Sequence, residues 1–430
     1  MARQCQCDRY GGDWLKSYGH RIACMTHQSV VKNSGSAFHI RPGTTAYRRA
    51  SAGLLLAGLC TFNTLYCVQP LMPLYSSSFH VNADSTALLL SLAMSCLAIS
   101  LFLAAPLADR WGRKPVMLTS MFLAGILTFL VSVLHDWTSV LICRALSGFA
   151  LGGLPAVAMT YIAEEIEPAA MSGMMGFYIG GNALGGVMGR LLNAFLADFY
   201  SWRFALQVSG LTAVAGALLA LWLLPRSRVF VPRRTAHSSA RRIYGGHLAD
   251  PAILLLLAQG GLLAGAFVVT LNILTYRLVA APFSLSIGIT SLVFVVYLLG
   301  TPATILAGRA LPRTGGFRML GLGVGLMLAG TSVMSISNLP AIALGLALIT
   351  IVFFVGHSTA SWWVGVRSAQ GRAQAASLCL FCFYAGAGGV SWVGGHAWTW
   401  WQWTGITLLL SALLLFAMAC AVGLRRASPA

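Results

Sequence analysis

The sequence predicts an all-α membrane protein with twelve transmembrane helices in two pseudo-symmetric six-helix halves. Hydrophobic residues make up 57% of its 430 residues and charged residues only 9%, whereas soluble chains carry about a quarter charged residues. Apolar stretches of membrane-spanning length recur along most of the chain, and one arginine-rich stretch divides them into two sets of six. This composition excludes an ordinary soluble enzyme and a disordered protein.

A transmembrane helix needs about 20 mostly apolar residues, and backbone amides in lipid must be satisfied within the segment, which excludes open strands. Between Trp392 and Trp403 the sequence is rich in Gly and Trp, so a re-entrant or interfacial turn is an alternative there. The spans are predicted near 50–73, 85–107, 115–134, 139–162, 171–195, 203–224, 252–276, 284–307, 318–336, 340–363, 374–395 and 402–424.

Polar, basic segments flank and divide the two halves. The first of them contains no apolar run long enough for a secretory signal peptide, and an over-extended start, with Met25 as an internal alternative, is a second interpretation. The predicted segments are a cytoplasmic tail at 1–48, a six-helix half at 49–224, a cytoplasmic linker at 225–250, a second half at 251–424 and a cytoplasmic C-terminus at 425–430.

The basic residues indicate the orientation. With the N-terminus in the cytoplasm, 24 of the 28 lysines and arginines fall in cytoplasmic segments, as the positive-inside rule requires. We therefore expect a multi-pass protein of the bacterial inner membrane with both termini cytoplasmic and anionic lipid at that face. Because these cations are scattered and form no groove, nucleic-acid binding is not expected, despite a net charge of +18.

The acidic residues are distributed as unevenly. All ten carboxylates lie at or before Asp250. The arginines of the second half must therefore pair with anionic lipid, with helix C-terminal carbonyls or with the first half.

The loop after the second span reads Ala-Pro-Leu-Ala-Asp-Arg-Trp-Gly-Arg-Lys-Pro at 105–115. Glycine permits a tight turn between antiparallel helices, and the aspartate can accept charge-assisted hydrogen bonds. The run resembles the G-x-x-x-D-R-x-G-R-R/K signature of the major facilitator superfamily, except that Ala105 replaces the leading glycine. A degraded copy lies 203 positions later, with Pro312 in place of the acid, as two repeated halves predict. The matching residues are Asp109, Arg110, Gly112, Arg113 and Lys114.

The resemblance implies a role for this loop in gating. In the superfamily the loop acid docks on the eleventh helix, which implies that Asp109 steadies the state closed at the cytoplasmic side. Arg113 is expected to assist by pairing with Glu164 or Glu165 at the end of the fourth span. A solvated helix end is the alternative interpretation of these two acids.

Two arginines lie within predicted spans. Arg144 and Gly148 resemble the R-x-x-x-G element of the superfamily's fourth helix, and an arginine in hydrocarbon is costly unless it faces a cavity or a partner. We expect Arg144 to point inward, with structural pairing as the alternative. Arg190 lies toward the outer end of span five, where it could extend to the interface.

Further elements resemble the 12-helix drug:proton antiporter-1 group, and within it the YnfM-type inner-membrane permeases. Span five carries Gly-Asn-x-x-Gly-Gly, with Asn182 where antiporters have proline, and Pro70 and Pro73 end the first span. Trp202-Arg203 begins the sixth. The resemblance covers about residues 45–425.

Polar residues at mid-span positions are candidates for the substrate cavity of an alternating-access carrier. For each of them, packing or an interfacial position is the alternative, and His357 could also exchange protons. A cavity with little negative charge favours neutral or anionic solutes over cationic drugs. The candidates are Asn63, Tyr66, Gln69, Asn182, Asn272, Tyr276, His357 and Tyr384.

These features predict a secondary active transporter that moves a small solute across the inner membrane by alternating access. The resemblance implies proton-coupled efflux. Since no carboxylate lies at mid-depth, a proton-independent facilitator is one alternative, and a non-transporting sensor on a carrier scaffold is another. No nucleotide-binding loop or metal-spaced cluster occurs, so we expect no enzyme activity, cofactor or metal, and a monomer.

Overall fold

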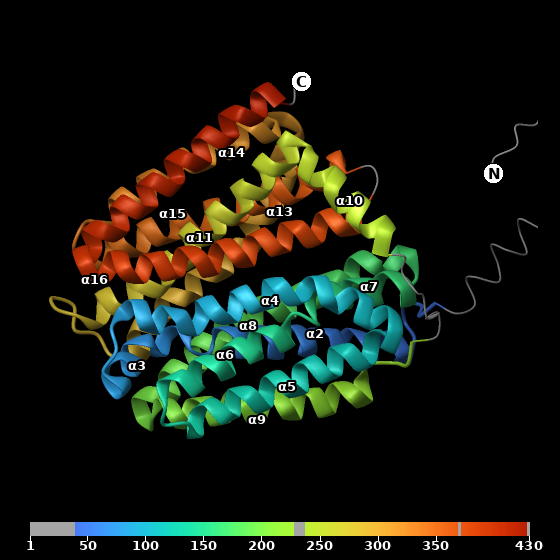
Figure 1. Ribbon diagram of the computed structural model, residues 1–430, viewed down its shortest axis with the longest axis horizontal. Helices are drawn as coiled ribbons and strands as arrows, with labels where there is room; N and C mark the ends of the chain where they lie inside the picture. Colours follow the sequence, from blue (N-terminus) through green and yellow to red (C-terminus); the bar gives the residue numbers. More distant parts are fainter. Residues whose placement is uncertain (1–38, 228–236, 369–370, 428–430) are drawn as a thin grey trace, which may run out of the picture.

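The computed structural model describes residues 39–227, 237–368 and 371–427, and this part of the chain is almost entirely helical (Figure 1). The predicted tail therefore lies mostly outside the described residues. The first elements are α2 (Thr45–Tyr66), η1 (Gln69–Leu71), α3 (Met72–Phe79), α4 (Ala83–Trp111), α5 (Arg113–Val133), α6 (Trp137–Leu151), α7 (Pro155–Glu165), η2 (Pro168–Ala170), α8 (Met171–Phe199) and α9 (Trp202–Leu223). They are followed by α10 (His237–Ala249), α11 (Pro251–Val279), α12 (Ile287–Ser291), η3 (Leu292–Leu299), α13 (Gly300–Thr314), α14 (Gly316–Met334), α15 (Leu339–Arg367) and α16 (Arg372–Ala427).

The all-α membrane fold is confirmed. Ten helical segments of the described chain are long and apolar enough to cross a membrane. One further helix, α8, has 29 residues, and α16 consists of two helices that meet at Gln402, where φ is 49°. With α8 added and α16 divided at Gln402, helices occupy all twelve predicted spans.

Two stretches differ from the sequence predictions. The Gly- and Trp-rich stretch is helical, and the interruption is confined to Gln402, so the re-entrant alternative is wrong. Trp400 and Trp401 are 66% and 62% exposed, as expected of side chains at a membrane interface. In the linker, residues 237–249 form helix α10, an element that the sequence did not predict.

Several spans are broken rather than continuous. Pro70 lies in η1, Pro73 is the second residue of α3, and Pro155 is the first residue of α7. Proline is tolerated at these positions because the first helical residues have no N–H acceptor within the helix. The eighth span changes from α12 to the 3₁₀ segment η3 and back to α13.

The two sets of helices lie side by side in Figure 1, with α2–α9 in the lower part and α11–α16 in the upper part. Between the sets, α4 packs on α16, and α8 packs on α12 and η3. The end of the bundle with α7 and α10 is here called the basic end (Figure 1). The Arg113–Glu164 and Arg367–Asp250 pairs place the 109–114 loop and Arg367 at this end. The other end, with α3, is called the opposite end.

Glycines on one face of α8 let it pack against the backbone of α2. A Cβ atom on Gly181 would lie 2.2 Å from the Leu55 carbonyl oxygen, and one on Gly185 would lie 2.2 Å from that of Leu59. Residues four apart share a helix face, and small residues allow membrane helices to approach closely. These glycines therefore determine how near the two helices lie.

We expect Gly181→Ala to destabilise the protein by about 1–3 kcal/mol, because the added methyl group overlaps a backbone carbonyl that cannot move aside locally. Gly180→Ala is the matched control, since nothing lies within 4 Å of its Cβ position. It should be neutral or stabilising by up to ~1 kcal/mol through helix propensity. Thermal unfolding in detergent measures both, and equal effects would contradict the proposed packing.

Candidate functional site

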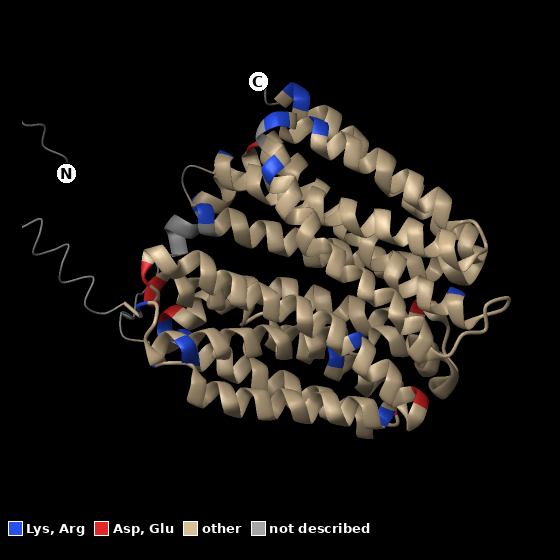
Figure 2. Ribbon diagram, turned by 180° about the vertical axis from the view of Figure 1, so that it is seen from behind, with Lys and Arg blue, Asp and Glu red and all other residues tan. Residues whose placement is uncertain are grey.

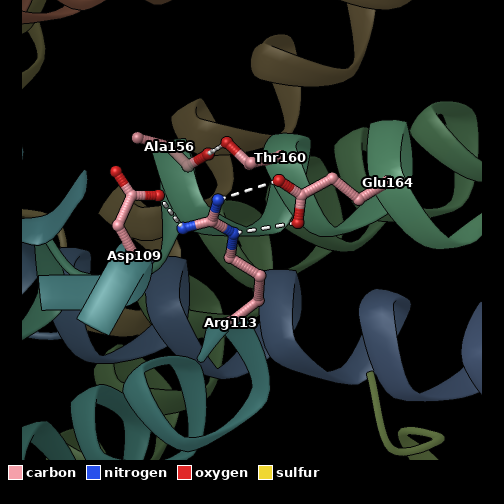
Figure 3. Close-up of polar contacts among 5 residues, drawn as sticks. All are labelled: Asp109, Arg113, Ala156, Thr160 and Glu164. Carbon is pink, nitrogen blue, oxygen red and sulfur yellow. Dashed lines mark hydrogen bonds and ion pairs between the residues drawn. The ribbon is translucent and has the colours of Figure 1, made fainter. Parts of the chain in front are cut away.

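The loop between α4 and α5 forms an ion-pair cluster at the basic end (Figure 3). Gly112, with φ 96°, ends α4 and starts α5. Arg113 donates to Asp109 Oδ1 at 2.6 Å and to the two Glu164 oxygens at 2.8 and 3.0 Å. Bidentate charge-assisted bonds of this kind are strong and directional. The cluster therefore holds the loop against the end of α7.

All members of this cluster belong to the first half. Among the described residues, Asp109 is paired with Arg113 and makes no ion pair with α16, so the docking on the eleventh helix that the resemblance implies is not seen in this conformation. Glu165 is buried, and its backbone carbonyl accepts a 2.8 Å hydrogen bond from the Ile40 amide. Lys114 donates to the carbonyls of Leu221 and Leu224 at the end of α9, whereas Arg110 is exposed.

Arg144 is fully buried and points inward as expected, but it lines neither of the two cavities described below. Its guanidinium donates to the carbonyl oxygens of Thr64, Leu65 and Leu89 at 3.0–3.2 Å. Two of these carbonyls lie at the end of α2, where the helix break leaves them without intrahelical partners. Arg144 thus has the structural role that was the alternative.

The expectation that Arg190 reaches the membrane interface is wrong. Its side chain is 1% exposed. Nε donates to Gln69 Oε1 at 2.5 Å and Nη1 donates to the Gly186 carbonyl at 2.6 Å. The guanidinium carbon lies 3.8 Å from the centroid of the Tyr66 ring, so the charge is enclosed within the bundle.

A cavity of about 330 Å³ lies between the two halves. Three of the eight candidate substrate residues line it, namely Asn182, His357 and Tyr384. A second cavity, of about 410 Å³, extends past Thr160 and Tyr244. The two cavities share His357 and Leu380, so the His357 imidazole lies at their junction.

The first cavity is mostly aromatic and apolar. His357 stacks on Phe353 with 5.8 Å between ring centroids, and its buried Nδ1 has no hydrogen-bond partner in the described chain. The other lining residues are Phe62, Ile179, Ala183, Tyr297, Thr301, Thr304, Ile305, Phe354, Leu380 and Phe383.

Three of the remaining candidates join the halves at the opposite end instead of lining the cavity. Gln69 Nε2 donates to Asn272 Oδ1 at 2.5 Å, and Asn272 Nδ2 donates to Ser391 Oγ at 2.9 Å. The Tyr276 hydroxyl is hydrogen-bonded to Ser76, at 2.9 Å, and to Thr86. These residues connect the first two spans of the first half with the seventh span, which is also bonded to the eleventh.

The last two candidates are packed inside the first half. Asn63 is buried where α2 passes Gly189, and Tyr66 lies beneath Arg190.

Acidic residues that were not among the candidates strengthen the contact between the halves. Asp198, at the end of α8, accepts a 2.8 Å hydrogen bond from the Gly288 amide of α12. Asp84, in the first turn of α4, lies 3.8 Å from His396 Nε2 and accepts a hydrogen bond from Thr399. Their positions beside predicted loops were the only sequence signal for them. The opposite end is therefore closed in this conformation.

Arginines of the second half use the partners that the uneven distribution of acids predicts. Arg277 donates to the carbonyls of Met334 and Ser335 at the end of α14. Arg367 pairs with Asp250 at 2.7 Å, and this hydrogen bond lowers the pKa of the Asp250 carboxyl. Helix-end carbonyls and the last carboxylate thus replace acids within that half.

Comparison with known proteins identifies the family that has this architecture. The sequence model of the Major Facilitator Superfamily matches residues 54–388. The chain is 38% identical over 387 residues to the inner membrane transport protein YnfM of Escherichia coli, covering 90% of this chain and 93% of YnfM. It is 36% identical over 381 residues to the uncharacterized MFS-type transporter YybF of Bacillus subtilis, covering 88% and 94%.

The fold resembles that of a bacterial homologue of the human lysosomal transporter Spinster, solved in an inward-facing, unoccupied conformation. The TM-score is 0.71 at 15% identity, over 90% of this chain and all of that one. Together with the family match and the two relatives, the helical architecture shows that this multi-pass membrane protein belongs to the major facilitator superfamily of transporters.

Proposed function

We propose that the protein is a secondary active transporter that moves a small solute across the bacterial inner membrane by alternating access, as proton-coupled efflux. The observation that carries the proposal is a cavity between two halves that are hydrogen-bonded to each other at the opposite end. Breaking these contacts while closing the basic end would expose the same cavity to the other side.

The charge distribution supports the orientation. Lysines and arginines gather at the basic end (Figure 2), and the positive-inside rule assigns such a face to the cytoplasm. We therefore propose that both termini and the Arg113 cluster are cytoplasmic and contact anionic lipid. The conformation is then inward-facing.

Asp109 is suited to stabilise the other state, in which the basic end is closed and the opposite end is open. The eleventh span begins at Arg372, and the N-terminus of a helix attracts a carboxylate through its free N–H groups and its dipole. When the basic end closes, Asp109 would leave Arg113 and dock there. Glu164 would keep Arg113 paired throughout.

His357 is the proposed proton-exchanging group. It lies where the two cavities meet, and imidazole is the side chain whose charge changes most readily near neutral pH. A proton-independent facilitator remains the alternative, favoured by the lack of a carboxylate along either described cavity lining.

A substrate is first identified by comparing solute accumulation in cells that overexpress the protein and in cells that lack it. We then expect the purified protein in liposomes containing a pH-sensitive dye to couple entry of that solute to alkalinisation of the lumen. His357→Gln should abolish the pH change. Solute entry at the normal rate without any pH change would establish the facilitator instead.

Asp109→Asn should lower the transport rate roughly tenfold or more, a change of about 1.4 kcal/mol in the barrier, without lowering expression. The amide cannot supply the charge that docking on α16 requires, while Arg113 keeps Glu164. Asp136→Asn is the matched control, because Asp136 caps α6 through the Ser139 amide and asparagine caps equally well. Unchanged transport in Asp109→Asn would contradict the proposed docking of Asp109 on α16.

Tyr276→Phe should open the opposite end more often, because it removes the two hydroxyl hydrogen bonds to Ser76 and Thr86. Two hydrogen bonds contribute about 1–2 kcal/mol, so amide hydrogen exchange in α3 should become several-fold faster. Tyr200→Phe, at an exposed tyrosine, is the control. Equal exchange in both variants would contradict the assignment of this contact as a closure.

A further inference from the structure

Arg190 differs from the other buried or half-buried arginines of the spans. Arg144, Arg203 and Arg277 each donate to carbonyls at the C-terminal end of another helix. The Gly186 carbonyl, four residues back on α8, already has its place in that helix's own hydrogen bonds. Arg190 therefore donates no hydrogen bond to the free carbonyls of a helix end.

Within the described chain, the Arg190 guanidinium has neutral partners only. Gln69 and Gly186 accept its hydrogen bonds, and its other neighbours are the Tyr66 hydroxyl and aromatic faces. A buried charge without a counter-charge is costly, and an ionisable residue inside a membrane protein marks a functional site by default. Among the residues that the structure describes, no carboxylate neutralises the Arg190 charge.

The aromatic cover over Arg190 is built on an irregular segment. Phe294 and Tyr297 have ring centroids 5.1 and 5.3 Å from the guanidinium carbon, and both belong to η3. A 3₁₀ stretch within a longer helix has poorer hydrogen bonds and often marks a hinge. The cover can therefore move more easily than a ring on a regular α-helix.

The Arg190 guanidinium lies directly behind the cavity between the two halves. Tyr297 lines the cavity on one face and covers Arg190 on the other. Phe62, also in the lining, packs on Tyr66 with centroids 5.8 Å apart. One layer of rings thus separates the guanidinium from a space of about 330 Å³, which suits a solute of about one ring in size.

We propose, building on the transport function proposed above, that Arg190 binds the anionic group of the transported solute and that the substrate is a small organic anion. Rotation of the Tyr297 side chain opens the path from the cavity to the guanidinium. A carboxylate there forms the charge-assisted hydrogen bonds that Gln69 now supplies only as a neutral acceptor. Asn182, Thr301 and His357 then face the rest of the solute.

This site also connects substrate binding with the closure of the opposite end. Gln69 bonds Arg190 within the first half and Asn272 across the halves. An anion on Arg190 competes for the guanidinium and releases the Gln69 carbonyl. The bound solute therefore weakens the network that holds the two halves together at that end.

The test measures ligand-induced thermal stabilisation of the purified full-length protein in detergent, with benzoate and benzamide as probes. The two have the same shape and differ in charge. We expect wild-type protein to bind benzoate roughly tenfold more tightly than benzamide. Arg190→Gln should abolish this preference, Arg190→Lys should retain part of it, and Tyr297→Ala should strengthen benzoate binding several-fold.

Arg203→Gln is the matched control, since it removes a cation that donates to the Ser132 and Leu134 carbonyls, and it should keep the wild-type preference. Equal binding of the two probes by wild-type protein, or no benzoate binding by wild-type and Tyr297→Ala at tens of millimolar, would overturn the proposal. If Arg190→Gln does not fold, Arg190→Lys and Tyr297→Ala decide. Arg190-dependent benzoate binding without any solute transport would overturn the transport function and leave this site standing.

Discussion

The need to satisfy backbone carbonyls inside the membrane underlies most of this structure. Water is absent from the bilayer core, so a carbonyl released where a helix ends or breaks must find a donor within the protein. Arg144 supplies two such bonds at the break after α2. Lys114 and Arg277 do the same at the ends of α9 and α14. Broken spans are stable here because long cationic side chains complete their hydrogen bonding.

This use of cations explains how so basic a protein can contain so few acids. An arginine that donates to helix-end carbonyls meets the negative end of the helix dipole and needs no carboxylate. Arg203 and Arg277 also stack on Trp202 and Trp403, with the guanidinium carbons 4.4 and 4.1 Å from the ring centroids. The carboxylates remain available for the contacts that join segments, such as Arg113 to Glu164 and Arg367 to Asp250.

The sequence predicted the features that depend on composition and local pattern, and missed those that depend on distant partners. Span positions and the all-α fold follow from hydrophobic length, which is local. The role of Arg144 depends on carbonyls 55 to 80 residues away, and a one-dimensional pattern does not show the direction of a side chain. The same limit applies to Arg190, to Asp84 beside His396 and to the break at Gln402. Which of the eight candidate residues line the cavity depends on the direction in which each helix face points, and only the three-dimensional structure shows this.

A conformational switch of this kind requires that each charge keep a partner in both states. Arg113 meets the requirement, because Glu164 holds it with two bonds while Asp109 contributes one. Loss of Asp109 would therefore not leave a buried cation unpaired, which would be strongly destabilising. At the opposite end the contacts from Gln69 and Tyr276 join neutral groups, each contributing about 0.5–1.5 kcal/mol. To reverse a strongly biased equilibrium between two states, a ligand must bind one state more favourably by roughly 5.5 kcal/mol. The combined free energy of these neutral contacts is smaller than that. Two halves that are joined at that end mainly by neutral hydrogen bonds, with the Asp84 and Asp198 contacts in addition, can thus exchange states while Arg113 keeps a charged partner at the basic end.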